Sequence, residues 1–335
     1  MPAIRAEALV KHFPPDIRAV DGIDLDIPHG RVFGFLGANG SGKTTTVRML
    51  TTLLRPTSGH AEIDGLDVLR HSTDVRRRIG VALQEAGLDD IQTGRELLEL
   101  QARLHGLPTR RVRERSAELL RIVELEDAAG RQIKTYSGGM RRRLDLAAAL
   151  VHAPSIVFLD EPTTGLDPIS RETIWRYVRQ LNATGGVTFF LTTQYLEEAD
   201  RLADEVAIMD AGRIVAQGSP AELKAGIGTD VVTARIDGGA ADLARAEQAM
   251  RRFEGLDDIR IVDGSVVVYV RDGAAAIARI VLLLDEADVR VGEVTLARPT
   301  LDDVFLRETG HHIEADGPIP PRAADRAGAG AGEPH

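Results

Sequence analysis

The chain has 335 residues, which suits about two domains, and 43% of them are hydrophobic, enough to build ordinary globular cores. A formal net charge of −10 argues against a general nucleic-acid-binding surface, and the absence of cysteine excludes disulfide and thiol chemistry while permitting an intracellular setting. We expect neither a membrane-spanning segment nor a signal peptide, because no apolar run approaches about 20 residues and the chain does not open on a charged-then-apolar pattern.

A glycine-rich loop follows the first predicted strands. Residues 3–9 and 21–27 are predicted as strands of an antiparallel flank, residues 31–36 as a buried strand and residues 45–50 as a helix. Between the last two lies a full match to the phosphate-binding pattern G-x-x-x-x-G-K-[ST], made of Gly37, Ala38, Asn39, Gly40, Ser41, Gly42, Lys43 and Thr44. In this pattern backbone N–H groups surround the phosphates of a nucleotide, the lysine contributes positive charge, and the threonine hydroxyl holds Mg²⁺. Together with Thr45 at the helix start, these residues predict a nucleoside-triphosphate site.

Residues 90–150 are rich in predicted helix. A strand at residues 79–83 ends before Gln84, and periodic apolar residues predict helices at 96–104, 110–123 and 141–153. The segment before the last of these helices consists of Ser137, Gly138, Gly139 and Met140. Its free N–H groups and serine hydroxyl would form an anion site at the helix start, although taken alone the segment indicates only a capped helix. Short basic runs at 76–78, 110–111 and 141–143 are flanked by acids, so we expect solvated helix faces.

An apolar run at residues 155–159 ends in Asp160 and Glu161. This is typical of a buried parallel strand with acids at its carboxyl end, where α/β sheets bind ligands. Asp160 is placed to reach Mg²⁺, and Glu161 is placed to orient or deprotonate an attacking water. The alternative, a strand end with two solvated acids, is disfavoured by the phosphate loop upstream.

The chain changes character beyond Lys224. A hairpin is predicted at 203–215, and the order strand 231–236, helix 240–253, strands 259–262 and 266–270, helix 274–287 and strand 289–296 is that of a ferredoxin-like α+β unit. Thr300 is expected to cap a final amphipathic helix. From His311 onward we expect a disordered tail, in which adjacent histidines are more often a surface accident than a metal site.

These motifs together resemble those of the ATP-binding cassette (ABC) ATPases over about residues 3–220. Residues 37–44 are similar to the family's Walker A motif, 156–161 to its Walker B motif and 137–140 to its signature, with Met140 where glutamine is commoner. The resemblance implies that Gln84 contacts Mg²⁺ and reports to a membrane partner. It also implies that Asp167, within Gly165-Leu166-Asp167, couples two cassettes across a dimer. Phe13 stands where an aromatic ring stacks on adenine, although a core role suits it equally.

One position departs from the family pattern. Residues 191–200 are similar to the switch segment, but Gln194 stands where the family has histidine. An amide donates a hydrogen bond to a γ-phosphate as imidazole does, but it carries neither a titrating proton nor a charge. Hydrolysis through Glu161 is unaffected by this change. The glutamine, the signature and the C-terminal region resemble the daunorubicin-resistance type of ATP-binding subunit, a branch that serves drug and lipid exporters.

The resemblance implies an α/β P-loop cassette with an antiparallel β flank in residues 1–224, including a helical subdomain at about 85–150. An α+β accessory domain would occupy residues 225–310, and the tail 311–335. It further implies ATP and Mg²⁺ as cofactors, ATP hydrolysis coupled to export, a homodimeric nucleotide sandwich, a separately encoded membrane permease and a place at the cytoplasmic face of the membrane. The alternative is a soluble cassette ATPase acting on ribosomes or nucleic acid. One phosphate loop, one signature and no heptad array disfavour that alternative.

Overall fold

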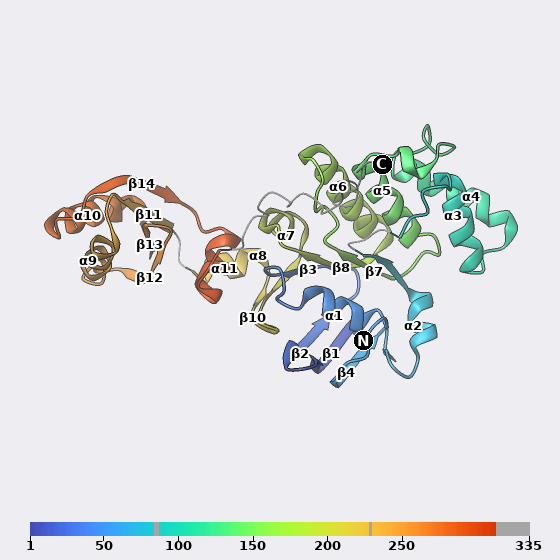
Figure 1. Ribbon diagram of the computed structural model, residues 1–335, viewed down its shortest axis with the longest axis horizontal. Helices are drawn as coiled ribbons and strands as arrows, with labels where there is room; N and C mark the ends of the chain where they lie inside the picture. The colour runs from blue at the N-terminus through green and yellow to red at the C-terminus, as the bar shows by residue number, and fades with distance from the viewer. Residues whose placement is uncertain (84–86, 228–229, 313–335) are drawn as a thin grey trace, which may run out of the picture.

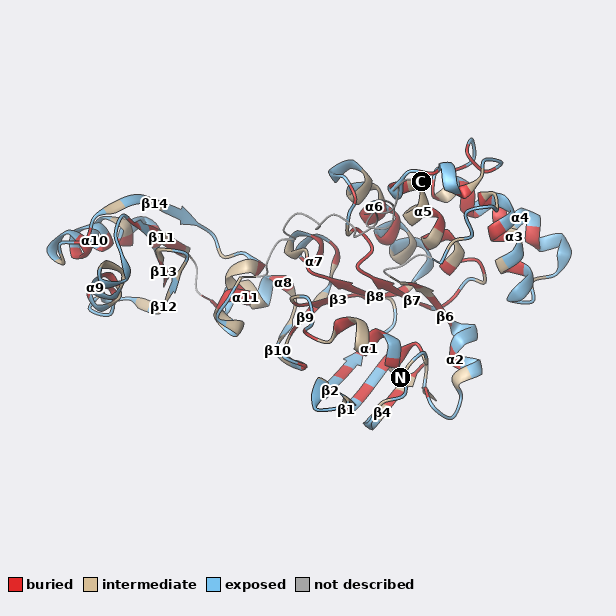
Figure 2. Cartoon of the chain, in the orientation of Figure 1, coloured by how far each residue is buried: buried red, intermediate tan, exposed pale blue. Residues whose placement is uncertain are grey.

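The computed structural model describes residues 1–83, 87–227 and 230–312, and its largest sheet has six strands (Figure 1). The strand order is β10-β9-β3-β8-β7-β6, and all neighbours are parallel except β10, which runs antiparallel to β9. The strands are β3 (Val32–Leu36), β6 (Ile79–Ala82), β7 (Ile156–Asp160), β8 (Thr188–Thr193), β9 (Glu205–Asp210) and β10 (Arg213–Gly218). Every residue of β3, β7 and β8 is buried (Figure 2), as expected for apolar strands covered on both faces.

A second sheet forms the antiparallel flank, in the order β2-β1-β4-β5. Its strands are β1 (Ile4–Phe13), β2 (Ile17–Ile27), β4 (Ser58–Ile63) and β5 (Leu66–Asp67). The two predicted strands are confirmed, and each extends beyond its predicted range. Register shifts interrupt the β1–β2 pairing, which breaks the apolar alternation on which the prediction relied.

An aromatic cluster joins the two sheets through the central strands. Phe190 lies 5.4–5.5 Å, between ring centroids, from Phe33, Phe35 and Phe158. All four rings are fully buried, and the same cluster includes apolar residues of the flank. This packing fixes β3, β7 and β8 relative to one another, and these strands carry the predicted site residues at their carboxyl ends.

Helices cover the central sheet, with α1 on one side and α5, α6 and α7 on the other (Figure 1). The helices of this part are α1 (Lys43–Leu50), α2 (Ser72–Arg78), α3 (Gly94–Leu104), α4 (Thr109–Ile122), α5 (Gly138–Ala149), α6 (Pro168–Gly185), α7 (Leu196–Leu202) and α8 (Pro220–Ala225). A 3₁₀ turn spans Ile133–Thr135. Of the helices in the described residues, none combines the length and apolarity needed to cross a membrane.

Helix α5 occupies a different range from the predicted 141–153. It begins at Gly138 because the Ser137 side chain accepts a hydrogen bond from the Met140 N–H and caps the helix there. It ends at Ala149, and the predicted extension to residue 153 is ruled out there by the positive φ of 55° at Ala153, which precedes Pro154. The segment predicted as an anion site is therefore the first turn of the helix itself.

The C-terminal part has the predicted β-α-β-β-α-β order. Its elements are β11 (Asp230–Ile236), α9 (Ala240–Met250), β12 (Leu256–Val262), β13 (Ser265–Val270), α10 (Gly273–Glu286) and β14 (Val291–Ala297). The strand order is β12-β13-β11-β14 and every neighbouring pair is antiparallel, which is the arrangement of a ferredoxin-like unit. The ferredoxin-like fold class is confirmed, whereas the domain boundary at residue 224 stays a prediction.

The last helix, α11 (Leu301–Thr309), returns to the cassette and contacts α7, α8 and β10 (Figure 1). Thr300 caps it as predicted, in a reciprocal pair with Asp303. Phe305 is fully buried in a cluster that also contains Leu36, the residue before the phosphate loop. The described part of the chain ends at His312, so the rest of the predicted tail, residues 313–335, lies outside it.

Candidate nucleotide-binding and catalytic site

The phosphate-binding loop leaves no room for side chains at two of its glycines. A Cβ atom on Gly37 would lie 2.4 Å from the Met209 carbonyl oxygen, and one on Gly42 would lie 2.2 Å from the Ala19 carbonyl oxygen. Gly42 also has a φ of 111°, a conformation that residues with a side chain rarely adopt. The loop is therefore held close to the main chain of Ala19 and Met209.

Lys43 is almost fully buried at the start of that helix. Its Nζ donates to the carbonyl oxygens of Gly37, at 2.8 Å, and Ala38, at 2.9 Å. It also lies 3.8 Å from Oε1 of Glu161. Burial lowers the pKa of Lys43, and the carboxylates of Glu161 and Asp160 oppose this effect. The ammonium is thus fixed inside the loop by the contacts it makes there, and its contact with phosphate stays a prediction.

Strand order brings the three candidate motifs to one edge of the sheet. β8 lies between β3 and β7, with Thr193 in register with Leu36 and Thr192 in register with Asp160. The residues that follow these positions are therefore adjacent at the carboxyl edge. They are Gly37 of the phosphate loop, Gln194 of the switch segment and Glu161 of the Walker B motif.

Asp160 collects two hydroxyl groups. Its Oδ1 accepts from the Thr192 hydroxyl at 2.6 Å and from the Thr44 hydroxyl at 3.2 Å. The predicted metal ligands Thr44 and Asp160 thus meet, and their oxygens are the hard donors that Mg²⁺ prefers. Gln84, the third predicted ligand, lies outside the described residues.

Glu161 is held in a defined and uncommon backbone conformation. Its φ is +49°, which few residues other than glycine adopt. Its N–H donates to both the carbonyl and the hydroxyl of Thr192, at 3.1 and 3.0 Å, and its Oε2 accepts from the Thr164 hydroxyl at 3.2 Å. These contacts orient a nearly buried carboxylate beside the phosphate loop.

Gln194 directly follows β8 and is 5% exposed. The main chain beside it is fixed, because the Gly37 N–H donates to the Thr193 carbonyl at 3.4 Å and the Tyr195 N–H donates to the Thr193 hydroxyl at 2.8 Å. The amide therefore stands at the phosphate-loop edge of the sheet, while its contact with a γ-phosphate stays a prediction.

The signature residues lie at the start of α5, which covers the opposite side of the central sheet from α1, the helix after the phosphate loop (Figure 1). Ser137 and Gly138 are exposed, whereas Gly139 is buried against α6, where a Cβ atom would lie 2.6 Å from the Ser170 hydroxyl oxygen. Nearby, exposed Asp167 caps α6 by accepting from the N–H and the hydroxyl of Ser170, at 3.0 and 2.7 Å. The signature thus presents its serine and first glycine outward.

Phe13 is half-buried at the end of β1 and belongs to none of the buried clusters of the described residues. The ammonium of Lys11 lies 5.1 Å from its ring centroid. The core interpretation of Phe13 is therefore wrong, while its contact with adenine stays a prediction.

Sequence reasoning missed Glu198 of α7. This fully buried carboxylate accepts from the Thr163 hydroxyl at 3.0 Å and the Trp175 indole N–H at 2.9 Å, and burial raises its pKa. Its hydrogen bonds connect α7 to the loop after β7 and to α6. The sequence sets it beside Glu197, which is exposed, so it gave no signal that distinguished the buried carboxylate.

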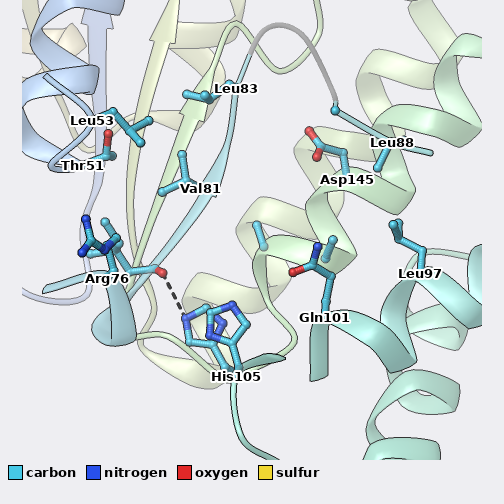
Figure 3. Close-up of a pocket in the computed structure, with 15 residues that line it drawn as sticks. Thr51, Leu53, Arg76, Val81, Leu83, Leu88, Leu97, Gln101, His105 and Asp145 are labelled. Atoms are coloured by element: carbon cyan, nitrogen blue, oxygen red, sulfur yellow. Dashed lines mark hydrogen bonds between the residues drawn. The ribbon is translucent and has the colours of Figure 1, made fainter. Parts of the chain in front are cut away.

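A cavity of about 370 Å³ lies between β6 and the helices α3 and α5 (Figure 3). Polar residues in its lining include Gln101, His105, Asp145 and His152. The His105 and His152 rings stack in parallel with centroids 3.8 Å apart, and Nε2 of His152 donates to the Ile79 carbonyl at 3.0 Å. Burial raises the pKa of Asp145 to about 6, and burial together with His105 lowers that of His152 to about 4.

The fold and the site define an ATP-binding cassette ATPase. Residues 20–164 match the ABC transporter family, and residues 218–309 match the C-terminal domain of DrrA1-3-like ATP-binding proteins. The chain is 47% identical to the daunorubicin resistance ATP-binding protein DrrA2 of Streptomyces coeruleorubidus, over 93% of this chain and 96% of that one. It therefore belongs to the daunorubicin-resistance type of ABC ATP-binding proteins, and it is an ATPase.

Other relatives agree with this assignment. The doxorubicin resistance ATP-binding protein DrrA of Mycobacterium tuberculosis is 42% identical over 89% of this chain and 91% of its own. The Nod factor export ATP-binding protein I of Ralstonia nicotianae is 38% identical over 93% of this chain and 95% of its own. Among solved structures, a dimeric ATP-binding cassette bound to ADP and Pi is 26% identical with a TM-score of 0.60, covering 64% of this chain and 98% of that one.

Proposed function

We propose that this chain is the ATP-binding and ATP-hydrolysing subunit of an exporter of drugs, antibiotics or lipids, with the membrane-spanning part on a separate polypeptide. The observation that carries the proposal is the similarity to drug-resistance and Nod-factor-export ATP-binding proteins along almost the whole chain, including the accessory unit. We place the chain at the cytoplasmic face of the membrane, where ATP is available to such a subunit.

The chemistry follows from the five residues that meet at the carboxyl edge of the sheet. Thr44 and Asp160 would hold Mg²⁺, which supplies charge neutralisation at the phosphates when bound. Lys43 places its ammonium on the same phosphates. Glu161 orients and deprotonates the attacking water, because its carboxylate is fixed beside the loop and bonded by Thr164. Gln194 donates a neutral hydrogen bond at this edge.

Two copies of the chain are needed to complete each site. Ser137 and Gly138 are exposed and lie at the start of α5, a helix on the opposite side of the central sheet from α1, which follows the phosphate loop (Figure 1). A second copy that places its Ser137 over the nucleotide would enclose ATP from both sides, with Asp167 at the same interface. The anion-binding character of an exposed helix start supports this arrangement.

The membrane subunit would contact the cavity between β6 and the helices α3 and α5 (Figure 3). Leu83 lines this cavity and directly precedes Gln84, and α5 leads from the cavity to the signature. A segment of the membrane subunit bound in this cavity would contact both the end of β6 and α5.

The test is co-purification of the full chain with a membrane protein encoded beside it, followed by ATPase and transport assays in vesicles. We expect a stable complex whose transport stops when Glu161 is changed to Gln. A chain that instead sediments with ribosomes and ignores the membrane protein would contradict the proposal.

A further inference from the structure

Arg142 has the most buried side chain of the basic run at 141–143. The structure shows that the expectation of a solvated helix face is wrong for it, because its side chain is only 11% exposed. Its guanidinium donates to three main-chain carbonyl oxygens: Nη1 to Leu83 at 2.6 Å, Nη2 to Asp160 at 2.7 Å and Nε to Pro162 at 2.9 Å. Nη1 also donates to Oδ2 of Asp145 at 3.2 Å.

Two of these carbonyls bracket Glu161 in the chain. Asp160 precedes it and Pro162 follows it, so the guanidinium bonds the backbone on both sides of the carboxylate-bearing residue. Glu161 has a φ of +49°, a conformation that persists only where surrounding contacts enforce it. The hydrogen bonds from Arg142 are contacts of that kind, since a charged donor makes stronger hydrogen bonds than a neutral one.

The third carbonyl extends the connection to β6. Leu83 follows that strand, while Arg142 itself lies in the second turn of α5, close to Ser137 and Gly138. One side chain thus joins the signature helix, the end of β6 and the end of β7. The planar guanidinium reaches these carbonyls from three separate nitrogens, whereas lysine carries all its donors on one nitrogen.

Neighbouring arginines have a different environment. Arg143 donates to the Val123 carbonyl at 3.0 Å, and Arg141 pairs with Asp90 at 2.7 Å. Both contacts fasten α5 within the helical part of the chain. Arg142 differs because two of its acceptors, the carbonyls of Asp160 and Pro162, lie on either side of Glu161, the residue that we propose orients the attacking water.

We propose that Arg142 is a positioning residue for ATP hydrolysis, which ties the signature helix to the backbone on both sides of Glu161 and holds that carboxylate in its reactive position. The proposal rests on the role assigned to Glu161 under the proposed function. It predicts that Arg142 acts on turnover and not on nucleotide affinity, because the phosphate loop has no bond to it in the described structure.

The experiment compares Arg142→Ala, Arg142→Lys and the control Arg143→Ala in the purified full chain. ATP affinity, KM, kcat and thermal unfolding are measured for each variant. We expect both Arg142 variants to lose about tenfold or more in kcat, with ATP affinity within about threefold of wild type, because small displacements of a catalytic group are costly. Arg143→Ala should keep kcat within about threefold of wild type. Added guanidinium should restore part of the kcat of Arg142→Ala, while the same concentration of tetramethylammonium should not.

Three outcomes would overturn the proposal: full kcat in Arg142→Lys, parallel losses in kcat and ATP affinity, or a kcat for Arg142→Ala no lower than that of Arg143→Ala. If Arg142→Ala does not fold, Arg142→Lys decides alone, since it keeps the charge and the aliphatic stem. Glu161→Gln separates the two hypotheses. If that variant still hydrolyses ATP at the wild-type rate, the role of Glu161 is wrong; if it does not, the result for Arg142 stands by itself.

Discussion

The hydroxyl of Thr44 donates a hydrogen bond to the carboxylate of Asp160 at 3.2 Å, although 116 residues separate them in the chain. One oxygen comes from the start of α1 and the other from the end of β7, so sheet topology alone unites them. The same edge carries Lys43, Glu161 and Gln194. This convergence supports the division of labour that the following predictions test.

Lys43→Ala and Glu161→Gln should fail at different steps. Removing the ammonium deletes a charge-assisted contact with phosphate, so ATP affinity should fall by about 1.5–3 kcal/mol, roughly 10- to 150-fold. Glu161→Gln should bind ATP within about threefold of wild type but lose about 10²- to 10⁴-fold in turnover. Equilibrium binding of a fluorescent ATP analogue and single-turnover hydrolysis separate these effects. Equal losses of affinity in both variants would refute the division of labour.

Gln194→Ala should slow hydrolysis by about 1–3 kcal/mol in activation free energy, because it removes a donor to a charged phosphate. Gln194→His should preserve or raise turnover. Residue 194 should add no ionisation near pH 6.5 in the wild type, since an amide does not titrate. The measurement is ATPase rate against pH for the three proteins. An alanine variant that hydrolyses ATP as fast as wild type across the pH range would show that Gln194 does not contribute to hydrolysis.

His152 should make the folded state less stable in acid. Burial and His105 lower its pKa to about 4 in the folded chain, below its ordinary value of 6.5, so between these values the unfolded chain binds a proton that the folded chain does not. Stability should therefore fall as the pH drops from 6.5 toward 4. His152→Gln should remove about 1–2 kcal/mol of this loss at pH 5, allowing for the ring's partial exposure.

Urea unfolding at pH 7.5 and pH 5 measures this difference. The exposed His71, changed to Gln, is the control and should leave the pH dependence as it is in wild type. Parallel stability curves for wild type and His152→Gln would contradict the prediction.

Phe305→Ala should destabilise the docking of α11 on the cassette. The ring is fully buried beside Leu36, and loss of such a side chain costs about 3–5 kcal/mol. Leu296→Ala, at a position 42% exposed on β14, should cost far less. Thermal unfolding of both variants provides the comparison. A Phe305→Ala variant as stable as wild type would mean that α11 is not held by this packing.

The proximity of the candidate nucleotide-site residues was predictable because they are contiguous in sequence or lie at strand ends that a parallel sheet places together. Arg142 was not predictable. A run of three arginines looks the same whether its middle member faces water or carbonyls, and its acceptors are 18, 20 and 59 residues away. The return of α11 to the cassette was missed for a similar reason, because amphipathicity shows that a helix packs but not against what.

The central claim, that two copies of the chain enclose ATP, is tested most directly by sedimentation of the Glu161→Gln variant with saturating Mg-ATP. The account predicts a nucleotide-dependent dimer that disappears when ATP is removed and does not form when Lys43 is also changed to Ala. A purely monomeric Glu161→Gln variant, in which bound ATP is confirmed and the membrane partner is present in detergent, would contradict it.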